Sequence, residues 1–312
     1  MIEAQSLTKV YLEKKAVDEI SFKINEGEIV GFLGPNGAGK TTTLRMLTGF
    51  LPPTSGKVYI SGYDMETQSL KAKKLIGYMP ESAALYNELK VIEYLKFRGQ
   101  LYNIPSKELE KNIDYILEAC FIKDVENTMI GNLSKGYRQR VALAGVLVHN
   151  PKILILDEPT IGLDPVQIVK IRELIKEIGK ERTVLLSTHI LPEAEIISDR
   201  VLVIDKGKIL AQDTPQNLKN TLKGNIIYEV QIKPPIENLE EFKKITGVIE
   251  IEKIKEENNE LHLKITSEKN LDLREKIFDF IYEKKLKLLG LSEKTLSMED
   301  VFIHLTMEEK EV

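Results

Sequence analysis

The sequence predicts an α/β fold, a mostly parallel sheet with helices on its faces, followed by a small α+β domain. Three observations predict it. Strand-like runs alternate with helix-like runs up to about residue 222, a glycine-rich loop joins one such strand to the next helix, and alternating strands dominate after Gly224. The length of 312 residues fits two domains. We therefore expect a first domain at 1–222 and a second at 223–312.

The strands of the first domain are short apolar runs, of the kind that a sheet buries on both faces. They are expected at Ile2–Leu7, Glu28–Leu33, Lys57–Ile60, Leu75–Met79, Ile153–Asp157, Thr183–Ser187 and Val201–Ile204. Helices expected between and after them include Thr41–Thr48, Pro165–Ile178 and Pro215–Leu222. This alternation favours a mostly parallel sheet as the core.

Strand signals vanish between about residues 85 and 150, where apolar residues recur at helical spacing. Helices are expected there at Val91–Leu101, Ser106–Cys120 and Ser134–His149. The pattern predicts a helical insertion between two strands of the core.

The second domain reads as strands at Asn225–Ile232, Val248–Ile254 and Glu260–Ile265, with helices at Leu271–Lys284 and Ser297–Thr306. It carries no clustered catalytic residues, and its single histidines, His262 and His304, are interpreted as structural. Its function is left open: it could steady a dimer or regulate one.

Composition excludes several classes of protein. The longest apolar runs are strand-sized, far from the ~20 residues that a membrane-spanning helix needs. The N-terminus has no signal-peptide core, so we expect a cytoplasmic chain. Net charge is −4 with no basic face, which argues against nucleic acid as a partner. One cysteine, Cys120, excludes an internal disulfide and a cysteine-rich metal site.

A phosphate-binding loop of the form GxxxxGK[ST] lies between an expected strand and an expected helix. Its residues are Gly34, Pro35, Asn36, Gly37, Ala38, Gly39, Lys40 and Thr41. Glycines let successive backbone N–H groups point at a phosphate, and the helix N-terminus adds a positive dipole end. Lys40 is expected to reach the β- and γ-phosphates, and the Thr41 hydroxyl to coordinate Mg²⁺. The alternative, an ordinary glycine-rich turn, leaves the lysine and the strand–helix context unexplained.

Four apolar residues, Ile153 to Leu156, are followed by two carboxylates: Asp157 ends the expected strand and Glu158 comes next. Asp157 would hold Mg²⁺ near Thr41, and Glu158 would act as general base on an attacking water. A strand that ends in Asp-Glu is common, so this interpretation depends on the phosphate loop upstream. His189 lies at the end of another expected strand, where ligands of parallel sheets bind.

Four motifs in order, GPNGAGKTT, LSKGYRQRV, ILILDEPTIGLDP and STH, make residues 1–222 resemble the ATP-binding cassette (ABC) ATPases. The resemblance implies a P-loop NTPase core with an antiparallel β subdomain and a helical insertion. It also implies ATP and Mg²⁺ as cofactors, and a dimer of cassettes that traps ATP between the phosphate loop of one subunit and the signature segment of the other.

Several residue roles follow from that resemblance alone. Ser134 and Gly136 of the signature segment would meet the γ-phosphate bound by the other subunit's phosphate loop, and Asp164 would cross the dimer interface. His189 would contact the γ-phosphate, Thr42 extends the phosphate loop, and Tyr11 would stack on adenine. Ser134 is also a plausible helix N-cap, and the two roles are compatible.

Two departures from the usual family pattern stand out. Lys135 replaces the first glycine of the common LSGGQ signature, and Glu81 stands where many members have Gln. Glu81 is expected near Mg²⁺, which would offset its charge beside Asp157 and Glu158. This pattern, with the segment Ser297–Phe302 (SMEDVF), resembles the A-subfamily-like exporters of the drug, sodium or gliding-motility type.

The leading hypothesis is therefore the ATP-hydrolysing subunit of an exporter, peripheral on the inner face of the cell membrane. A separate integral membrane subunit would dock near Glu81, Leu85 and Tyr86. The alternative is a soluble, non-transport ABC ATPase that acts on nucleic acid or ribosomes; such relatives usually carry two cassettes, coiled coils or zinc motifs. A non-hydrolysing regulator is disfavoured by Glu158.

Overall fold

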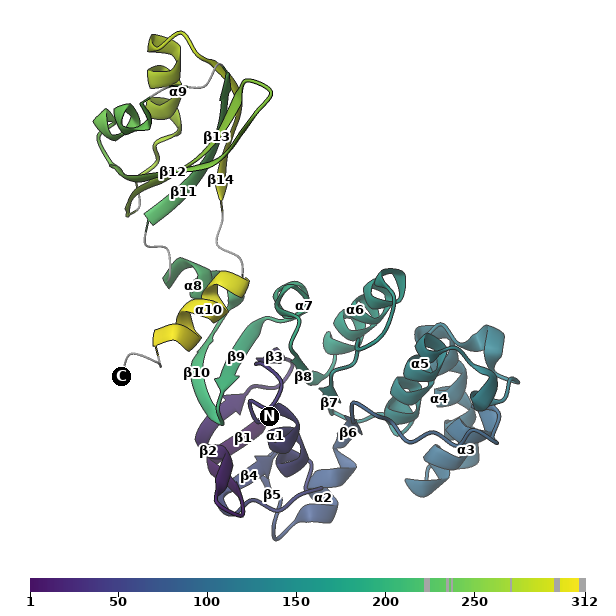
Figure 1. The fold of residues 1–312 in the computed structure, drawn as a ribbon. Helices are drawn as coiled ribbons and strands as arrows, with labels where there is room; N and C mark the ends of the chain where they lie inside the picture. The colour runs from purple at the N-terminus through teal and green to yellow at the C-terminus, as the bar shows by residue number, and fades with distance from the viewer. Residues whose placement is uncertain (222–224, 234–235, 237, 270, 295–297, 309–312) are drawn as a thin grey trace. The chain divides into compact units, whose positions relative to one another are not determined.

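The computed structural model describes residues 1–221, 225–233, 236, 238–269, 271–294 and 298–308. The chain divides into two compact units (Figure 1). The first is Met1–Pro215, to which residues 305–308 also belong, and the second is Gln216–His304. The predicted boundary between residues 222 and 223 falls outside the described residues and stays a prediction.

The central sheet of the first unit has the strand order β10-β9-β3-β8-β7-β6. Its strands are β3 (Ile29–Leu33), β6 (Ile76–Met79), β7 (Ile153–Asp157), β8 (Thr183–Thr188), β9 (Arg200–Asp205) and β10 (Lys208–Asp213). All neighbours are parallel except β9 and β10. Every residue of β3, β7 and β8 is buried, because both faces of the sheet are covered. The carboxyl ends of β3, β7 and β8 therefore meet at one edge.

A second, antiparallel sheet of order β2-β1-β4-β5 completes the β structure of this unit. It comprises β1 (Ile2–Tyr11), β2 (Lys14–Ile24), β4 (Ser55–Ile60) and β5 (Tyr63–Asp64). Ile2–Leu7 and Lys57–Ile60, grouped above with the strands of the mostly parallel core, lie here instead, in the antiparallel β subdomain that the resemblance implied. The tight turn at Leu12, which has a φ of 53°, folds β2 back onto β1, and this hairpin forces antiparallel pairing.

Helices flank the sheets, and the expected helical insertion is present. Beside the sheets lie α1 (Lys40–Leu47), α2 (Ser69–Lys74), α6 (Pro165–Gly179) and α7 (Leu191–Ile197). The insertion holds α3 (Val91–Leu101), α4 (Ser106–Ala119) and α5 (Lys135–Leu147), with 3₁₀ turns η1 (Lys123–Val125) and η2 (Ile130–Asn132). These three helices gather at one side of the first unit, beyond β6 and β7 (Figure 1).

The second unit is a four-stranded antiparallel sheet of order β12-β13-β11-β14. Its strands are β11 (Asn225–Lys233), β12 (Val248–Glu257), β13 (Glu260–Lys269) and β14 (Lys287–Lys294). The turn η3 (Leu239–Lys244) and helix α9 (Arg274–Glu283) connect them in a βαββαβ, ferredoxin-like sequence. Tyr228, Phe242, Leu263 and Ile277 are fully buried in its core.

In the sequence, helix α8 (Pro215–Thr221) precedes the first strand of this sheet, and helix α10 (Met298–Glu308) follows its last strand. Leu222 and Ser297, expected as helix residues, lie outside the described part. The α/β core and the α+β character of the second unit are confirmed. Within the described residues, we find no helix with the length and apolar character needed to cross a membrane.

Candidate functional site

The phosphate loop connects β3 to α1. Gly39, the N-cap of α1, has a φ of 110°, and a β-carbon there would lie 2.5 Å from the Ala16 carbonyl oxygen. A β-carbon on Gly34 would lie 2.3 Å from the Ile204 carbonyl oxygen. Only glycine fits either position, so the loop can curl tightly against the sheet and present the N-terminus of α1.

Lys40, the first residue of α1, is buried within this loop. Its Nζ donates hydrogen bonds to the backbone oxygens of Gly34 at 2.7 Å and Pro35 at 3.2 Å. The same Nζ lies 3.4 Å from Oε1 of Glu158. Because both side chains are only 6% exposed, water screens this charge pair little. The lysine is thereby fixed at the mouth of the loop.

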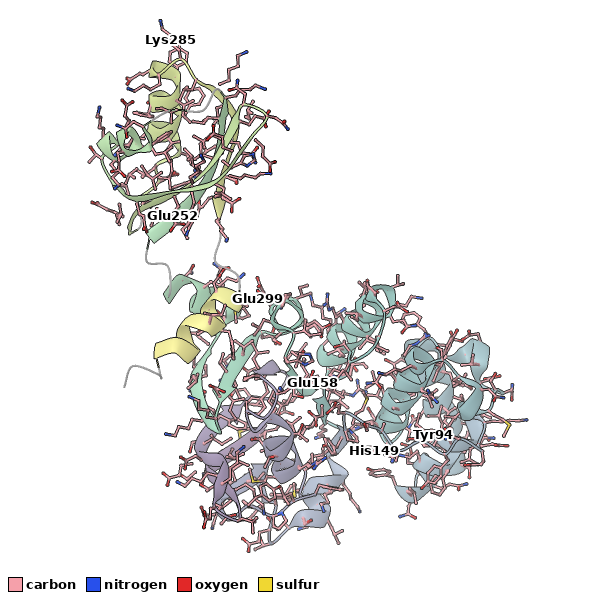
Figure 2. The ribbon with its side chains drawn as sticks, viewed as in Figure 1. Tyr94, His149, Glu158, Glu252, Lys285 and Glu299 are labelled. Atoms are coloured by element: carbon pink, nitrogen blue, oxygen red, sulfur yellow. The ribbon has the colours of Figure 1, made fainter. Side chains whose placement is uncertain are left out.

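Glu158 follows β7 and lies near the end of that strand (Figure 2). Its backbone has a φ of 49°, a left-handed conformation that is uncommon outside glycine. The Oε2 atom lies 2.8 Å from Nδ1 of His189, which follows β8. The sheet register brings these two residues together, because Asp157 pairs with Ser187 across the parallel strands. A carboxylate thus lies between a lysine cation and an imidazole.

Asp157 is fully buried beneath Glu158. Its Oδ1 accepts hydrogen bonds from Ser187 Oγ at 2.6 Å and from Thr41 Oγ1 at 3.3 Å. Its Oδ2 is buried and has no hydrogen-bond partner among the residues that the structure describes. A carboxylate oxygen without a partner beside a threonine hydroxyl is the donor set that Mg²⁺ prefers, so these residues fit that ion.

The loop and the two strand ends line one cavity of about 510 Å³. Eleven residues expected at the site line it: Tyr11, Pro35, Asn36, Gly37, Gly39, Lys40, Thr41, Thr42, Glu81, Glu158 and His189. Lys14, Ala16 and Ile161 also line it and were missed. Lys14 and Ala16 belong to β2, a strand that the sequence analysis did not predict. Gly34 and Ala38 belong to the loop, but Ala38 is buried in the core.

Tyr11 and Glu81 belong to the exposed part of the cavity lining. Tyr11 ends β1 and is 47% exposed, with Nζ of Lys9 lying 5.5 Å from its ring centroid. Glu81 follows β6 and is also exposed. The cavity therefore has an aromatic face available at one place and a carboxylate at another.

Ser134, Gly136 and Asp164 lie away from this cavity. Ser134 Oγ caps α5 by accepting the Tyr137 N–H at 3.4 Å, and Asp164 Oδ1 caps α6 by accepting the Gln167 N–H at 2.9 Å. A β-carbon on Gly136 would lie 2.2 Å from Gln167 Oε1. The starts of α5 and α6 are thus packed against each other.

Comparison with known proteins decides the family. Residues 17–161 match the family model described as ABC transporter, and residues 214–306 match the ATP-binding protein DrrA1-3-like, C-terminal domain. The uncharacterized ABC transporter ATP-binding protein YhcH of Bacillus subtilis is 34% identical over 100% of this chain and 97% of its own length. The chain belongs to the ATP-binding proteins of ABC transporters.

Two further similar proteins match about 70% of the chain. The linearmycin resistance ATP-binding protein LnrL of Bacillus subtilis is 36% identical over 74% of this chain and 75% of its own. A solved dimeric structure of the cassette MJ0796 in a post-hydrolysis state, bound to ADP and Pi, is 27% identical, with a TM-score of 0.63 over 69% of this chain and 98% of that one. The resemblance to the ABC family and to its drug-export branch is confirmed, and the protein is a nucleotide-binding ATPase.

One further residue of the site, which does not line the cavity, also had no role assigned from the sequence. Ser187 is fully buried at the end of β8, donates to Asp157, and its Oγ accepts the Glu158 N–H at 3.0 Å. The signal that could have found it is its place in the strand next to β7, at the same register as Asp157.

Proposed function

We propose that this cassette is the ATP-hydrolysing subunit of an exporter and drives a separate integral membrane subunit. The observation that carries the proposal is the position of Glu158, held between Lys40 and His189 in the phosphate-loop cavity. A binding module without hydrolysis has no need for a buried carboxylate at that place.

Three residues would perform the hydrolysis. Glu158 would accept the proton of the attacking water as the general base. Lys40 exchanges its bonds to Gly34, Pro35 and Glu158 for the β- and γ-phosphate oxygens. His189 orients the Glu158 carboxylate and contacts the γ-phosphate.

Thr41, Asp157 and Glu81 would hold Mg²⁺. Two observations support this. Oδ2 of Asp157 has no hydrogen-bond partner among the described residues, and the Thr41 hydroxyl lies beside the other oxygen of that carboxylate. Glu81 lines the phosphate-loop cavity together with Thr41. When bound, the ion would neutralise charge that develops on the phosphates.

ATP would lie along the loop Gly34–Thr42, with the half-exposed ring of Tyr11 stacked on adenine. Ser134, Gly136 and Asp164 lie away from this cavity, so they would contact ATP or the interface only in a dimer of cassettes. The dimeric MJ0796 cassette supports such an assembly. The helix N-terminus at Ser134 would then face the phosphate bound by the other subunit.

Export is proposed because LnrL is named for linearmycin resistance, and another relative, BcrA of Bacillus licheniformis, for bacitracin transport. The membrane subunit would dock near Glu81, Leu85 and Tyr86, which places the cassette on the inner face of the cell membrane. Tyr86 is 51% exposed, and its ring packs edge-on against Phe97 at 5.4 Å. Exposed aromatic rings of this kind suit a helix-in-groove contact.

The Glu158→Gln variant tests the hydrolysis. We expect ATP affinity within a few-fold of wild type, a kcat lower by about 10²–10⁴-fold, and a dimer that accumulates with ATP on gel filtration. Glu173→Gln makes the same charge change on the exposed face of α6 and should leave kcat unchanged. Wild-type turnover in Glu158→Gln would show that Glu158 is not the base.

Isolation of the full chain from membranes tests the coupling. We expect it to co-purify in detergent with an integral membrane protein whose presence raises ATP turnover. Clean isolation with ribosomes or DNA instead would contradict the exporter and favour a non-transport cassette.

A further inference from the structure

The two loops that carry Glu158 and His189 are joined a second time, behind the cavity. Two residues after Glu158, Thr160 Oγ1 donates a hydrogen bond to Oε2 of Glu193 at 2.5 Å. Glu193 stands four residues after His189, in the first turn of α7. The same pair of loops is therefore linked once in the cavity, at 2.8 Å, and once in the interior.

Glu193 is a buried carboxylate with a complete set of partners. Glu193 and Thr160 are each 1% exposed. Arg172 of α6 donates from Nη2 to the other Glu193 oxygen, Oε1, at 3.2 Å. A buried carboxylate costs several kcal/mol in desolvation unless a cation and hydrogen bonds compensate it. Arg172 and Thr160 provide both, so α6, α7 and the loop after β7 meet at one ionic contact, which we call the Glu193 clamp.

The loop is held from its other side as well. Gln139 of α5, 8% exposed, donates from Nε2 to the Pro159 backbone oxygen at 2.9 Å. Residues 159 and 160 are thus fixed by two different helices directly after Glu158. A left-handed backbone such as that of Glu158 persists only where its surroundings determine it. The clamp lies where such a constraint is needed.

We infer that Thr160, Glu193 and Arg172 are positioning residues for ATP hydrolysis, which set the separation of Glu158 and His189. None of the three lines the cavity, so they act through those two side chains. The inference rests on the proposed function, because it assigns the clamp to the same reaction.

Thr160→Val tests the clamp, since it keeps the β-branched shape and removes the hydroxyl. We expect kcat to fall about 10–100-fold, with the KM for ATP within about twofold, because small misplacements of catalytic groups have effects of that size. Thr160→Ser should restore most of the turnover. If Thr160→Val folds poorly, Glu193→Gln is the substitute, because it removes the charge opposite Arg172. It should likewise lower kcat and leave the KM for ATP within about twofold.

Thr183→Val is the matched control. Thr183 is also 1% exposed, lies at the opposite end of β8 from His189, and its hydroxyl accepts the Gly27 N–H at 3.0 Å. Both valine variants should lose thermal stability, but Thr183→Val should keep wild-type kcat. Equal kcat in the two valine variants would overturn the inference and leave the clamp a purely structural contact.

A double variant separates this inference from the proposed function. In Glu158→Gln, adding Thr160→Val should lower the residual turnover by no more than about twofold, because effects on one catalytic unit do not add. A full additional 10–100-fold loss would overturn the inference. If Glu158→Gln alone keeps turnover, the proposed base fails; if Glu158→Gln loses it while Thr160→Val does not, the clamp alone fails.

Discussion

Replacing Ser187 with alanine should destabilise the first unit through its contacts with the Asp157 carboxylate and the Glu158 backbone N–H. Its hydroxyl donates to Asp157 at 2.6 Å, a charge-assisted bond, and such bonds contribute about 1.5–3 kcal/mol. The Glu158 N–H also loses this oxygen, but the Ser187 backbone oxygen, at 3.2 Å, remains as its acceptor. The loss therefore comes mostly from Asp157, and we expect about 2 kcal/mol.

Thermal denaturation followed by circular dichroism measures this loss. For a unit of this size, about 2 kcal/mol corresponds to a fall in Tm of about 4–8 °C. Ser198→Ala is the control, because the Ser198 hydroxyl is buried without a hydrogen-bond partner in the described part of the chain. Removing an unpaired buried hydroxyl should leave Tm unchanged or raise it slightly. Equal Tm values for wild type and Ser187→Ala would refute the reasoning.

Three further predictions follow from single contacts. Lys40→Ala should weaken ATP binding about 10–100-fold, since it removes charged hydrogen bonds to phosphate. Isothermal titration calorimetry with ATP measures this change. An unchanged affinity would mean that Lys40 does not contact the phosphates. Burial lowers the pKa of His149 from 6.5 to about 4, so its neutral form stabilises the fold above pH 6.5 and this contribution is lost as the pH falls through 4. Between pH 6.5 and about 4, the unfolding free energy should depend less steeply on pH in His149→Phe than in wild type. An unchanged slope would show that other groups cause it. Tyr228→Phe should lower the stability of the second unit by about 1–3 kcal/mol in urea, because the Leu273 N–H loses an acceptor at 3.0 Å; a neutral result would mean that water replaces it.

Much of the site could be predicted because its residues are contiguous in the chain. The motif from Gly34 to Thr41 lies directly between an expected strand and an expected helix, and the four residues before Asp157 are all apolar. The antiparallel sheet was harder, since β2 (Lys14–Ile24) is interrupted by register shifts in its pairing with β1. Those irregularities weaken the alternation on which strand prediction depends.

The sequence by itself determined the phosphate loop, the two carboxylates at the end of β7 and the family, because local backbone conformation and residue spacing encode them. The tertiary structure decided which side chains come into contact. The parallel register of β7 and β8 places Ser187 on Asp157 and His189 on Glu158, across about 30 residues of intervening chain. It also decided that Glu193 is paired inside the protein and that Ser134 does not line the phosphate-loop cavity. Such contacts depend on how strands align and helices pack, and no local pattern contains that information.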